Sequence, residues 1–366
     1  MFRIIPSLFS LLFLLCGVCA ATPSSEKDLE SSLNHLASVV ATPHLQPDDA
    51  QVETLLSFLN GATRGKMVWE ESRKGWGTGV GTTFAVSSSL SGMMAYFYNP
   101  AISVEAVIPG LVRRVGDVTW EKGRDGRLFL VDDAGKKEPV VVRHAYQLYI
   151  TPDGNSGAYY SYKQHELSMV SSWKGRRYLL SVSLQPNASD VGRKGYPVVT
   201  QKGGKLYNYS GEKGLTRLGL GWVDSYIYRS LTITLYLEDA PGAETLSAIS
   251  FKWLNAGWLG KNMVKAHHID RGIDRFARHL DFFFQSPARV SPEAWAEVCE
   301  KIRELPTLAL KKIFSQQIAL MVKSESKNAT LFDDAYVGSL TRDELVAGVI
   351  SNHSVALLLG CKTVSL

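Results

Sequence analysis

The chain has 366 residues, of which 45% are hydrophobic and 20% are charged, and its formal net charge is +5 at pH 7. A chain of this length and apolar content can bury a complete core, which excludes an intrinsically disordered protein. The excess of basic residues is too small to indicate nucleic-acid binding, for which a strongly basic surface is expected.

Residues 1–20 have the pattern of a secretory signal peptide. Arg3 supplies a positive charge, an apolar stretch runs from Ile4 to Leu15, and the segment ends at the small residue Ala20. The apolar stretch is shorter than the roughly 20 residues that a membrane-spanning helix requires. We therefore expect cleavage near Ala20 and a soluble protein with no membrane span, exported to the periplasm or secreted.

The segment 21–65 is expected to be helical. Leu29, Leu33 and Leu36 recur at spacings of four and three, which is typical of an amphipathic helix. A second helix is predicted to begin near Pro47 and to end at Gly61.

The segment 66–240 is expected to form an antiparallel β region. It is rich in Val, Thr, Tyr and Trp, and turn signals interrupt it about every eight to fifteen residues. Apolar and polar residues alternate between Arg177 and Leu184, as in a strand with one buried face. Short turns between such runs predict hairpins, so we expect a sheet of about nine to eleven strands.

The segment 241–323 is predicted to be helical and to pack on the sheet. Apolar residues at helical spacing predict one helix between Leu246 and Gly257 and a longer one between Ile269 and Phe283. The C-terminal segment 324–366 is predicted to contain one helix. Together these elements predict an α+β fold, in which a large antiparallel sheet is flanked by N-terminal and C-terminal amphipathic helices that lie at the surface.

The glycine-rich run from Gly75 to Gly81 could form a phosphate-binding loop or lie within a strand. A phosphate loop requires a helix directly after the glycines, but the following residues, Thr82 to Val86, are typical of a strand. The sequence therefore favours close packing of the backbone beside this strand.

The sequence offers one geometrically reasonable set of metal ligands, on the predicted helix after Ile269. His267, Asp270 and Asp274 lie on one side of that helix. Arg271 and Arg278 could instead pair with the carboxylates, which makes a solvent-exposed charged face the simpler interpretation. We predict no metal site and no cofactor.

A basic, glycine-rich segment between Asn187 and Gly221 is the preferred candidate for binding. Its lysines and arginines are interleaved with tyrosines, which suits an anionic or glycan component of the cell envelope. A solvated hairpin whose basic residues maintain solubility is the alternative. The candidate residues are Arg193, Lys194, Tyr196, Lys202, Lys205, Tyr207, Tyr209, Lys213 and Arg217.

Cys299 and Cys361 are the cysteines that remain after residue 20. An even number of cysteines in an exported protein makes a disulfide between them a reasonable expectation. Alternatively, Cys299 belongs to the core, because Trp295, Val298 and Ile302 place it on an apolar helical stripe.

The sequence thus favours a non-enzymatic protein of the cell envelope that binds a ligand or partner. The ligand would lie between the sheet and its covering helices or along the basic segment, and an apolar small molecule is one of the expected ligands. A hydrolase whose active site is assembled from distant residues is the alternative, and a structural or assembly component is a third hypothesis.

Overall fold

The computed structural model describes residues 26–62, 66–73, 75–120, 140–152, 157–199, 206–216, 222–322, 334–358 and 360. The helices in these ranges are α1 (Glu26–Ala41), α2 (Asp49–Gly61), α3 (Leu90–Phe97), α4 (Val104–Val107), α5 (Ala266–Gln285), α6 (Pro292–Glu304), α7 (Thr307–Val322), α8 (Asp334–Ser339) and α9 (Arg342–Leu358). The predicted signal peptide, residues 1–20, lies outside the described residues.

The strands are β1 (Lys66–Arg73), β2 (Gly77–Val86), β3 (Val112–Trp120), β4 (Val140–Ile150), β5 (Ala158–Tyr159), β6 (Ser161–Trp173), β7 (Arg176–Leu184), β8 (Arg193–Val199), β9 (Leu206–Lys213), β10 (Leu215–Thr216), β11 (Trp222–Val223), β12 (Ser225–Glu238), β13 (Leu246–Trp258) and β14 (Lys261–Asn262).

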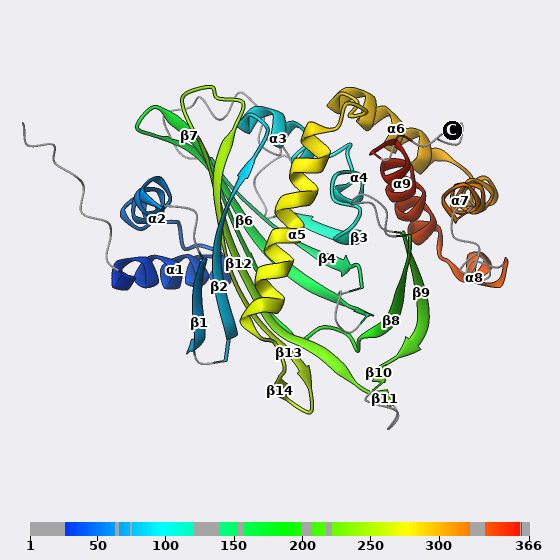
Figure 1. Ribbon diagram of the computed structural model, residues 1–366, viewed down its shortest axis with the longest axis horizontal. Helices are drawn as coiled ribbons and strands as arrows, with labels where there is room; N and C mark the ends of the chain where they lie inside the picture. The colour runs from blue at the N-terminus through cyan, green and yellow to red at the C-terminus, as the bar shows by residue number, and fades with distance from the viewer. Residues whose placement is uncertain are drawn as a thin grey trace, which may run out of the picture.

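A nine-stranded antiparallel sheet forms the centre of the fold (Figure 1). Its strand order is β1-β2-β13-β12-β7-β6-β4-β3, and β14 pairs with β13. Strands β5, β8 and β9 form a separate small sheet, and β10 pairs with β11. The predicted fold class, a large antiparallel sheet with helices at both ends of the chain, is confirmed.

One face of the main sheet is apolar and is covered by α1 and α2 (Figure 1). In β12, Leu231, Ile233 and Leu235 are fully buried in this layer, while Thr234 and Tyr236 lie on the opposite face because side chains alternate along a strand. The buried guanidinium of Arg143 in β4 also donates a hydrogen bond to the carbonyl of Val39, at the end of α1.

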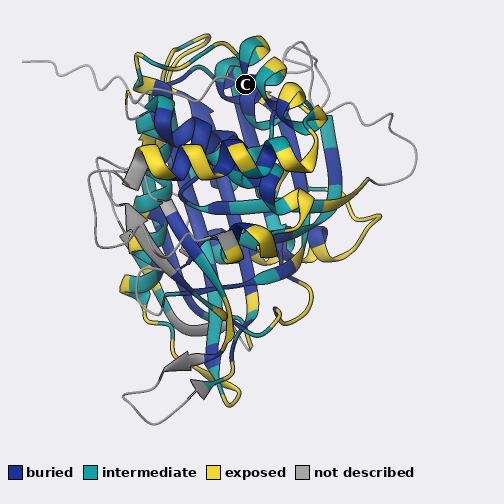
Figure 2. Ribbon diagram, turned by 90° about the vertical axis from the view of Figure 1, so that its right-hand side faces the viewer, coloured by how far each residue is buried: buried dark blue, intermediate teal, exposed yellow. Residues whose placement is uncertain are grey.

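The other face of the sheet is covered by α3, α4 and α5, with α6 to α9 at one end (Figure 1). Helix α5 crosses this face and buries Ile269 and Ile273 against Val80 of β2. Its last turns contact α3, where the rings of Phe283 and Tyr96 lie 5.1 Å apart. Figure 2 shows buried sheet strands behind helices whose outer faces are exposed, so helices cover this face of the sheet.

The predicted helix between Leu246 and Gly257 is wrong, because these residues form β13. The strand lies between β2 and β12, and its side chains are buried against both covering layers. A strand buried on both faces carries apolar residues at almost every position, so a spacing of three and four arises without a helix.

The expectation that every helix lies at the surface is also wrong for α9. This helix packs against α4, α6, α7 and β3, and buries most of its length, including the polar residues Asn352, His353 and Ser354. Because it is surrounded on nearly all sides, its sequence shows no apolar stripe. Helices α3 and α4 were also missed within the predicted β region.

The glycine-rich run forms part of β2, as the strand interpretation predicted. Gly79 and Gly81 lie directly opposite Trp253 and Phe251 of β13. A Cβ atom at Gly79 would lie 2.3 Å from Nε1 of Trp253. Glycine at alternate positions therefore leaves room for the large rings that cover β2 on the α1 and α2 side.

Both outer strands of the main sheet contain irregularities. The register of β1 with β2 shifts between Trp69 and Arg73, and that of β3 with β4 shifts between Gly116 and Thr119. Asp117 adopts a positive φ of 51° within the second irregularity. Along the ranges described, no helix is long and apolar enough to cross a membrane.

We expect Gly79→Ala to lower the free energy of unfolding by about 2 kcal/mol, because the added methyl group overpacks the fully buried Trp253. Gly272→Ala in α5 is the control: nothing lies within 4 Å of a Cβ atom there, so alanine should stabilise the helix by about 0.5 kcal/mol. Urea denaturation measures both changes. Equal effects of the two substitutions would contradict the packing of β2 against β13.

Candidate functional site

A cavity of about 880 Å³ lies between the polar face of the sheet and its covering helices. Strands β3, β4, β6, β7 and β12 contribute one side, and α3, α4, α5, α6 and α9 contribute the other. Apolar side chains from both sides line the cavity, namely Met93, Phe97, Ile102, Ile108, Leu148, Leu179, Phe276 and Val346.

The carboxylate of Glu166 in β6 is the centre of a polar cluster on the sheet side of this cavity. Its Oε2 accepts a hydrogen bond of 2.7 Å from the Tyr146 hydroxyl. Its Oε1 accepts hydrogen bonds from the hydroxyls of Ser181, at 3.0 Å, and Ser168, at 3.3 Å. Three donors on two oxygens are the pattern of an ionised carboxylate, which can only accept hydrogen bonds.

His144 and Gln164 complete this cluster. Nε2 of His144 lies 3.6 Å from Oε2 of Glu166, and the imidazole stacks on the ring of Tyr146. Nε2 of Gln164 donates to the Tyr146 hydroxyl at 2.7 Å. The side chains of His144 and Glu166 remain 12% and 15% exposed, so a molecule in the cavity can reach them.

The register of the sheet explains why these residues meet. His144 of β4 lies opposite Glu166 of β6, which lies opposite Ser183 of β7. Residues directly opposite each other on antiparallel strands place their side chains on the same face, about 5 Å apart. The cluster is therefore held by the backbone of three adjacent strands.

Three phenols around the carboxylate remain protonated. Burial, followed by the negative charge of Glu166, raises the pKa of Tyr98, Tyr146 and Tyr236 above its usual value. Tyr146 and Tyr236 line the cavity, as does Tyr98. Neutral phenols next to an ionised carboxylate give this part of the cavity a negative potential.

Hydroxyl groups continue across the sheet beneath α5. Ser168, Ser181, Thr234, Ser250 and Thr82 lie opposite one another on five successive strands. The Thr234 and Ser250 hydroxyls are 3.0 Å apart, and the Thr82 hydroxyl donates to the α5 residue Asp270 at 3.1 Å. Alternation of apolar and polar residues along these strands would predict that this face is exposed to solvent. In the structure it instead carries a row of hydrogen-bonded hydroxyl groups beneath α5.

Three arginines also line the cavity, and each is held by the protein. Arg303 donates to the carbonyl of Ala101 and to the Ser103 hydroxyl, both at 2.8 Å. Arg342 donates to two backbone carbonyls at the end of α6. Arg114 pairs with Asp343 at 3.2 Å and lies over a tyrosine ring.

The predicted basic segment does not converge on one point in the structure. Arg193 and Lys213 are exposed, and Lys194 pairs with Glu212. Tyr196 lies in β8, whereas Lys202, Lys205 and Arg217 lie outside the described residues. Tyr207 and Tyr209 line a pocket with Arg113 of β3, an arginine outside the predicted segment.

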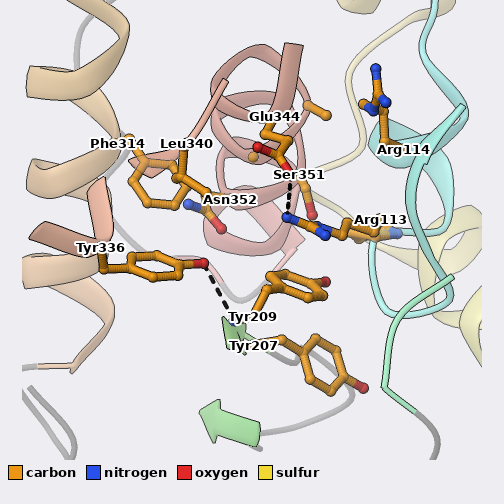
Figure 3. Close-up of a pocket in the computed structure, with 13 residues that line it drawn as sticks. Arg113, Arg114, Tyr207, Tyr209, Phe314, Tyr336, Leu340, Glu344, Ser351 and Asn352 are labelled. Atoms are coloured by element: carbon orange, nitrogen blue, oxygen red, sulfur yellow. Dashed lines mark hydrogen bonds and ion pairs between the residues drawn. The ribbon is translucent and has the colours of Figure 1, made fainter. Parts of the chain in front are cut away.

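Tyr207 and Tyr209 instead line a small pocket around Arg113 (Figure 3). The Arg113 guanidinium lies 4.0 Å from the ring centroid of Tyr209 and 2.9 Å from a carboxylate oxygen of Glu344. Burial raises the pKa of Tyr336 in the same pocket to about 12. With a volume of about 40 Å³, this pocket has room for a few water molecules only, so it connects β3, β9, α8 and α9 rather than holding a ligand.

The candidate metal ligands on α5 have partners within the protein. Asp270 accepts from Thr82, and Asp274 forms a 2.6 Å ion pair with the exposed Arg278. His267 is exposed and its ring contacts that of His268. Within the described ranges, no three histidine, cysteine or acidic side chains are grouped so that they could hold a metal ion.

Cys299 is fully buried in α6, between Trp295 and Ile302, as the core interpretation predicted. Burial raises the pKa of its thiol. Cys361 lies outside the described residues, so the disulfide between these two cysteines stays a prediction.

Sequence reasoning missed the cluster around Glu166. The signal for it is the presence of polar residues two positions apart, His144 and Tyr146 in one strand and Gln164 and Glu166 in the next. Alternation of this kind normally indicates a solvent-exposed face. Only the helices that cover this face convert it into one wall of a cavity.

We expect Arg113→Met to lower the free energy of unfolding by about 2 to 3 kcal/mol, because it leaves the partly buried Glu344 without its ion-pair partner. The matched control is Arg278→Met, which removes an exposed ion pair with Asp274 and should change stability by less than about 0.5 kcal/mol. Thermal and urea denaturation measure the difference, and a similar loss from both variants would contradict the structural role of the Arg113 pocket.

No protein-family model and no curated protein matches the sequence. Among solved structures, the chain is similar to the human StarD13 (DLC2) lipid transfer and protein localization domain, at 11% identity and a TM-score of 0.28. The match covers 66% of this chain and 99% of that domain. A likeness at this level supports no conclusion about what this chain binds.

Proposed function

We propose that this chain is an exported, non-enzymatic binding protein that holds an apolar small molecule with a polar end in the cavity beneath α5. The observation that carries the proposal is the cavity itself, with a volume of about 880 Å³, apolar walls and one polar cluster. Ligand sites in proteins have this size and this combination of surfaces.

The arrangement of the lining supports a ligand with two chemically different parts. Phe97, Ile108 and Phe276 provide apolar contacts from three helical or loop segments, while Glu166 and its donors lie on the sheet. Burial of the apolar part would supply most of the binding free energy, at about 25 cal/mol per Å² of surface removed from water. The polar cluster would orient the ligand.

Export is the part of the proposal that the N-terminal sequence supports. Arg3, the apolar stretch from Ile4 to Leu15 and the small residue Ala20 form the pattern of a secretory signal. N-terminal sequencing of the protein purified from its native host is expected to begin at Ala21. A mature chain that retains Met1 would contradict export.

A hydrolase is the second candidate, because His144 and Glu166 meet at the cavity. A serine nucleophile would have to donate its only hydroxyl hydrogen to a base. Ser168 and Ser181 each donate that hydrogen to Glu166, which instead acts as the acceptor of a structural cluster. Turnover of ester substrates that is lost in Glu166→Gln would favour the hydrolase over the binding protein.

The binding site can be tested with Ser183→Phe. Ser183 lines the cavity directly opposite Glu166, so a phenyl ring there would occupy the space of the ligand. We expect the affinity for the neutral fluorescent probe N-phenylnaphthylamine to fall about ten-fold or more, because the ring removes volume that the probe needs. Fluorescence titration measures the affinity.

The control for this variant is Ser172→Phe, which introduces the same ring at an exposed position of β6, outside the cavity. It should bind the probe as the wild type does, and circular dichroism should show that both variants are folded. Undiminished binding by a folded Ser183→Phe variant would exclude the cavity as the ligand site. Mass spectrometry of the natively purified protein would then identify any molecule bound elsewhere.

A further inference from the structure

The hydrogen bonds of the cavity define which kind of polar group a ligand can bring to it. This inference rests on the proposed function, because it concerns the ligand of the same cavity. Tyr146, Ser168 and Ser181 each direct their hydroxyl hydrogen at Glu166. These three donors are therefore already used within the protein.

These three assignments also determine which group is the donor in the neighbouring hydrogen bonds. The oxygens of Ser168 and Tyr98 are 3.1 Å apart, and Ser168 has given its hydrogen to Glu166, so Tyr98 must be the donor to Ser168. Gln164 likewise donates an amide hydrogen to Tyr146. Five side chains thus point a hydrogen along paths that end at one carboxylate, and the hydroxyl hydrogens of four of them, Tyr98, Tyr146, Ser168 and Ser181, are already used within the protein.

What the cluster still offers to a ligand is acceptor capacity. Two carboxylate oxygens have about four lone-pair directions, of which three are occupied by the hydroxyl donors. A group that donates a hydrogen bond can use the remaining direction on Glu166, beside Nε2 of His144, which lies 3.6 Å from Oε2. A carboxylate or phosphate would instead place a second negative charge beside Glu166, in a partly buried site where such repulsion is weakly screened.

The arginines that line the cavity do not provide an alternative anion site. Arg303 and Arg342 are fixed by backbone carbonyls and a serine hydroxyl, and Arg114 is paired with Asp343. The acidic residues Glu105 and Asp117 line the same cavity. An anionic ligand would therefore compete with these contacts for the guanidiniums and would lie near two further carboxylates.

We propose that the ligand of this cavity carries a hydrogen-bond-donating end, a hydroxyl or an ammonium group, which binds to Glu166, and that molecules ending in carboxylate or phosphate are rejected there. Glu166 is then the residue that determines specificity, while the apolar walls accept the body of the ligand. Ligands that end in a hydroxyl and ligands that end in an ammonium group can both donate a hydrogen bond to Glu166. The experiment below distinguishes between them.

The test uses three ligands with the same chain: dodecanol, dodecylamine and dodecanoate, each below its critical micelle concentration. Each displaces N-phenylnaphthylamine from the full-length mature protein, and displacement is followed by fluorescence at neutral pH. We expect the alcohol or the amine to bind about ten-fold more tightly than the carboxylate, the ratio expected from one hydrogen bond to a charged group. Tighter binding of the amine than of the alcohol would identify an ammonium ligand, and the reverse a hydroxyl ligand.

Glu166→Gln removes the charge with little change in shape, so the ten-fold preference should fall to about three-fold or less. The matched control is Glu300→Gln on the exposed surface of α6, which should keep the wild-type order of affinities. If the Glu166 variant does not fold, the order of the three ligands in the wild-type protein remains a sufficient test.

Tighter binding of dodecanoate than of both other ligands by the wild type would overturn the inference and leave the proposed function intact. An unchanged preference in a folded Glu166→Gln variant would also overturn it. Failure of the probe and of all three ligands to bind would instead contradict the proposed function itself.

Discussion

A carboxylate that is removed from water must be surrounded by hydrogen-bond donors, and the fold is arranged around this requirement at Glu166. The sheet is covered on both faces, but only the face toward α1 and α2 is uniformly apolar. On the other face, the strand register supplies Tyr146, Ser168 and Ser181 as donors to the carboxylate. Removing one hydrogen-bond donor from this carboxylate would lower the free energy of unfolding by more than the hydrogen bond itself contributes. The polar cluster therefore stabilises one arrangement of β4, β6 and β7.

The same arrangement would preorganise the cavity for the ligand that we propose. The cluster is built on three adjacent strands rather than on loops, so its geometry is set by the backbone ladder. A site whose groups are already positioned loses little conformational entropy on binding. The helices on the opposite side, α3, α5 and α9, supply the apolar surface, and α9 is itself fixed through Arg113 and Glu344.

Much of the fold could be predicted from the sequence, because strand alternation, turn residues and amphipathic stripes are local signals. The glycines of β2 also reflect local geometry. The errors at β13 and α9 share one cause, which is burial on all sides, since it erases the difference between apolar and polar faces. The cavity could not be predicted either, because alternation in β6 and β7 shows that Glu166 and Ser183 share a face but not that helices cover it.

The irregular outer strands have a consequence for the behaviour of the protein at high concentration. A long, regular strand at the border of a sheet presents unpaired amide and carbonyl groups that can recruit a second chain. Here β1 is interrupted before Arg73, and β3 is interrupted at Asp117. Each interruption twists the backbone and displaces its free hydrogen-bonding groups from a straight line. Such borders oppose the edge-to-edge pairing of one sheet with another and disfavour fibril growth.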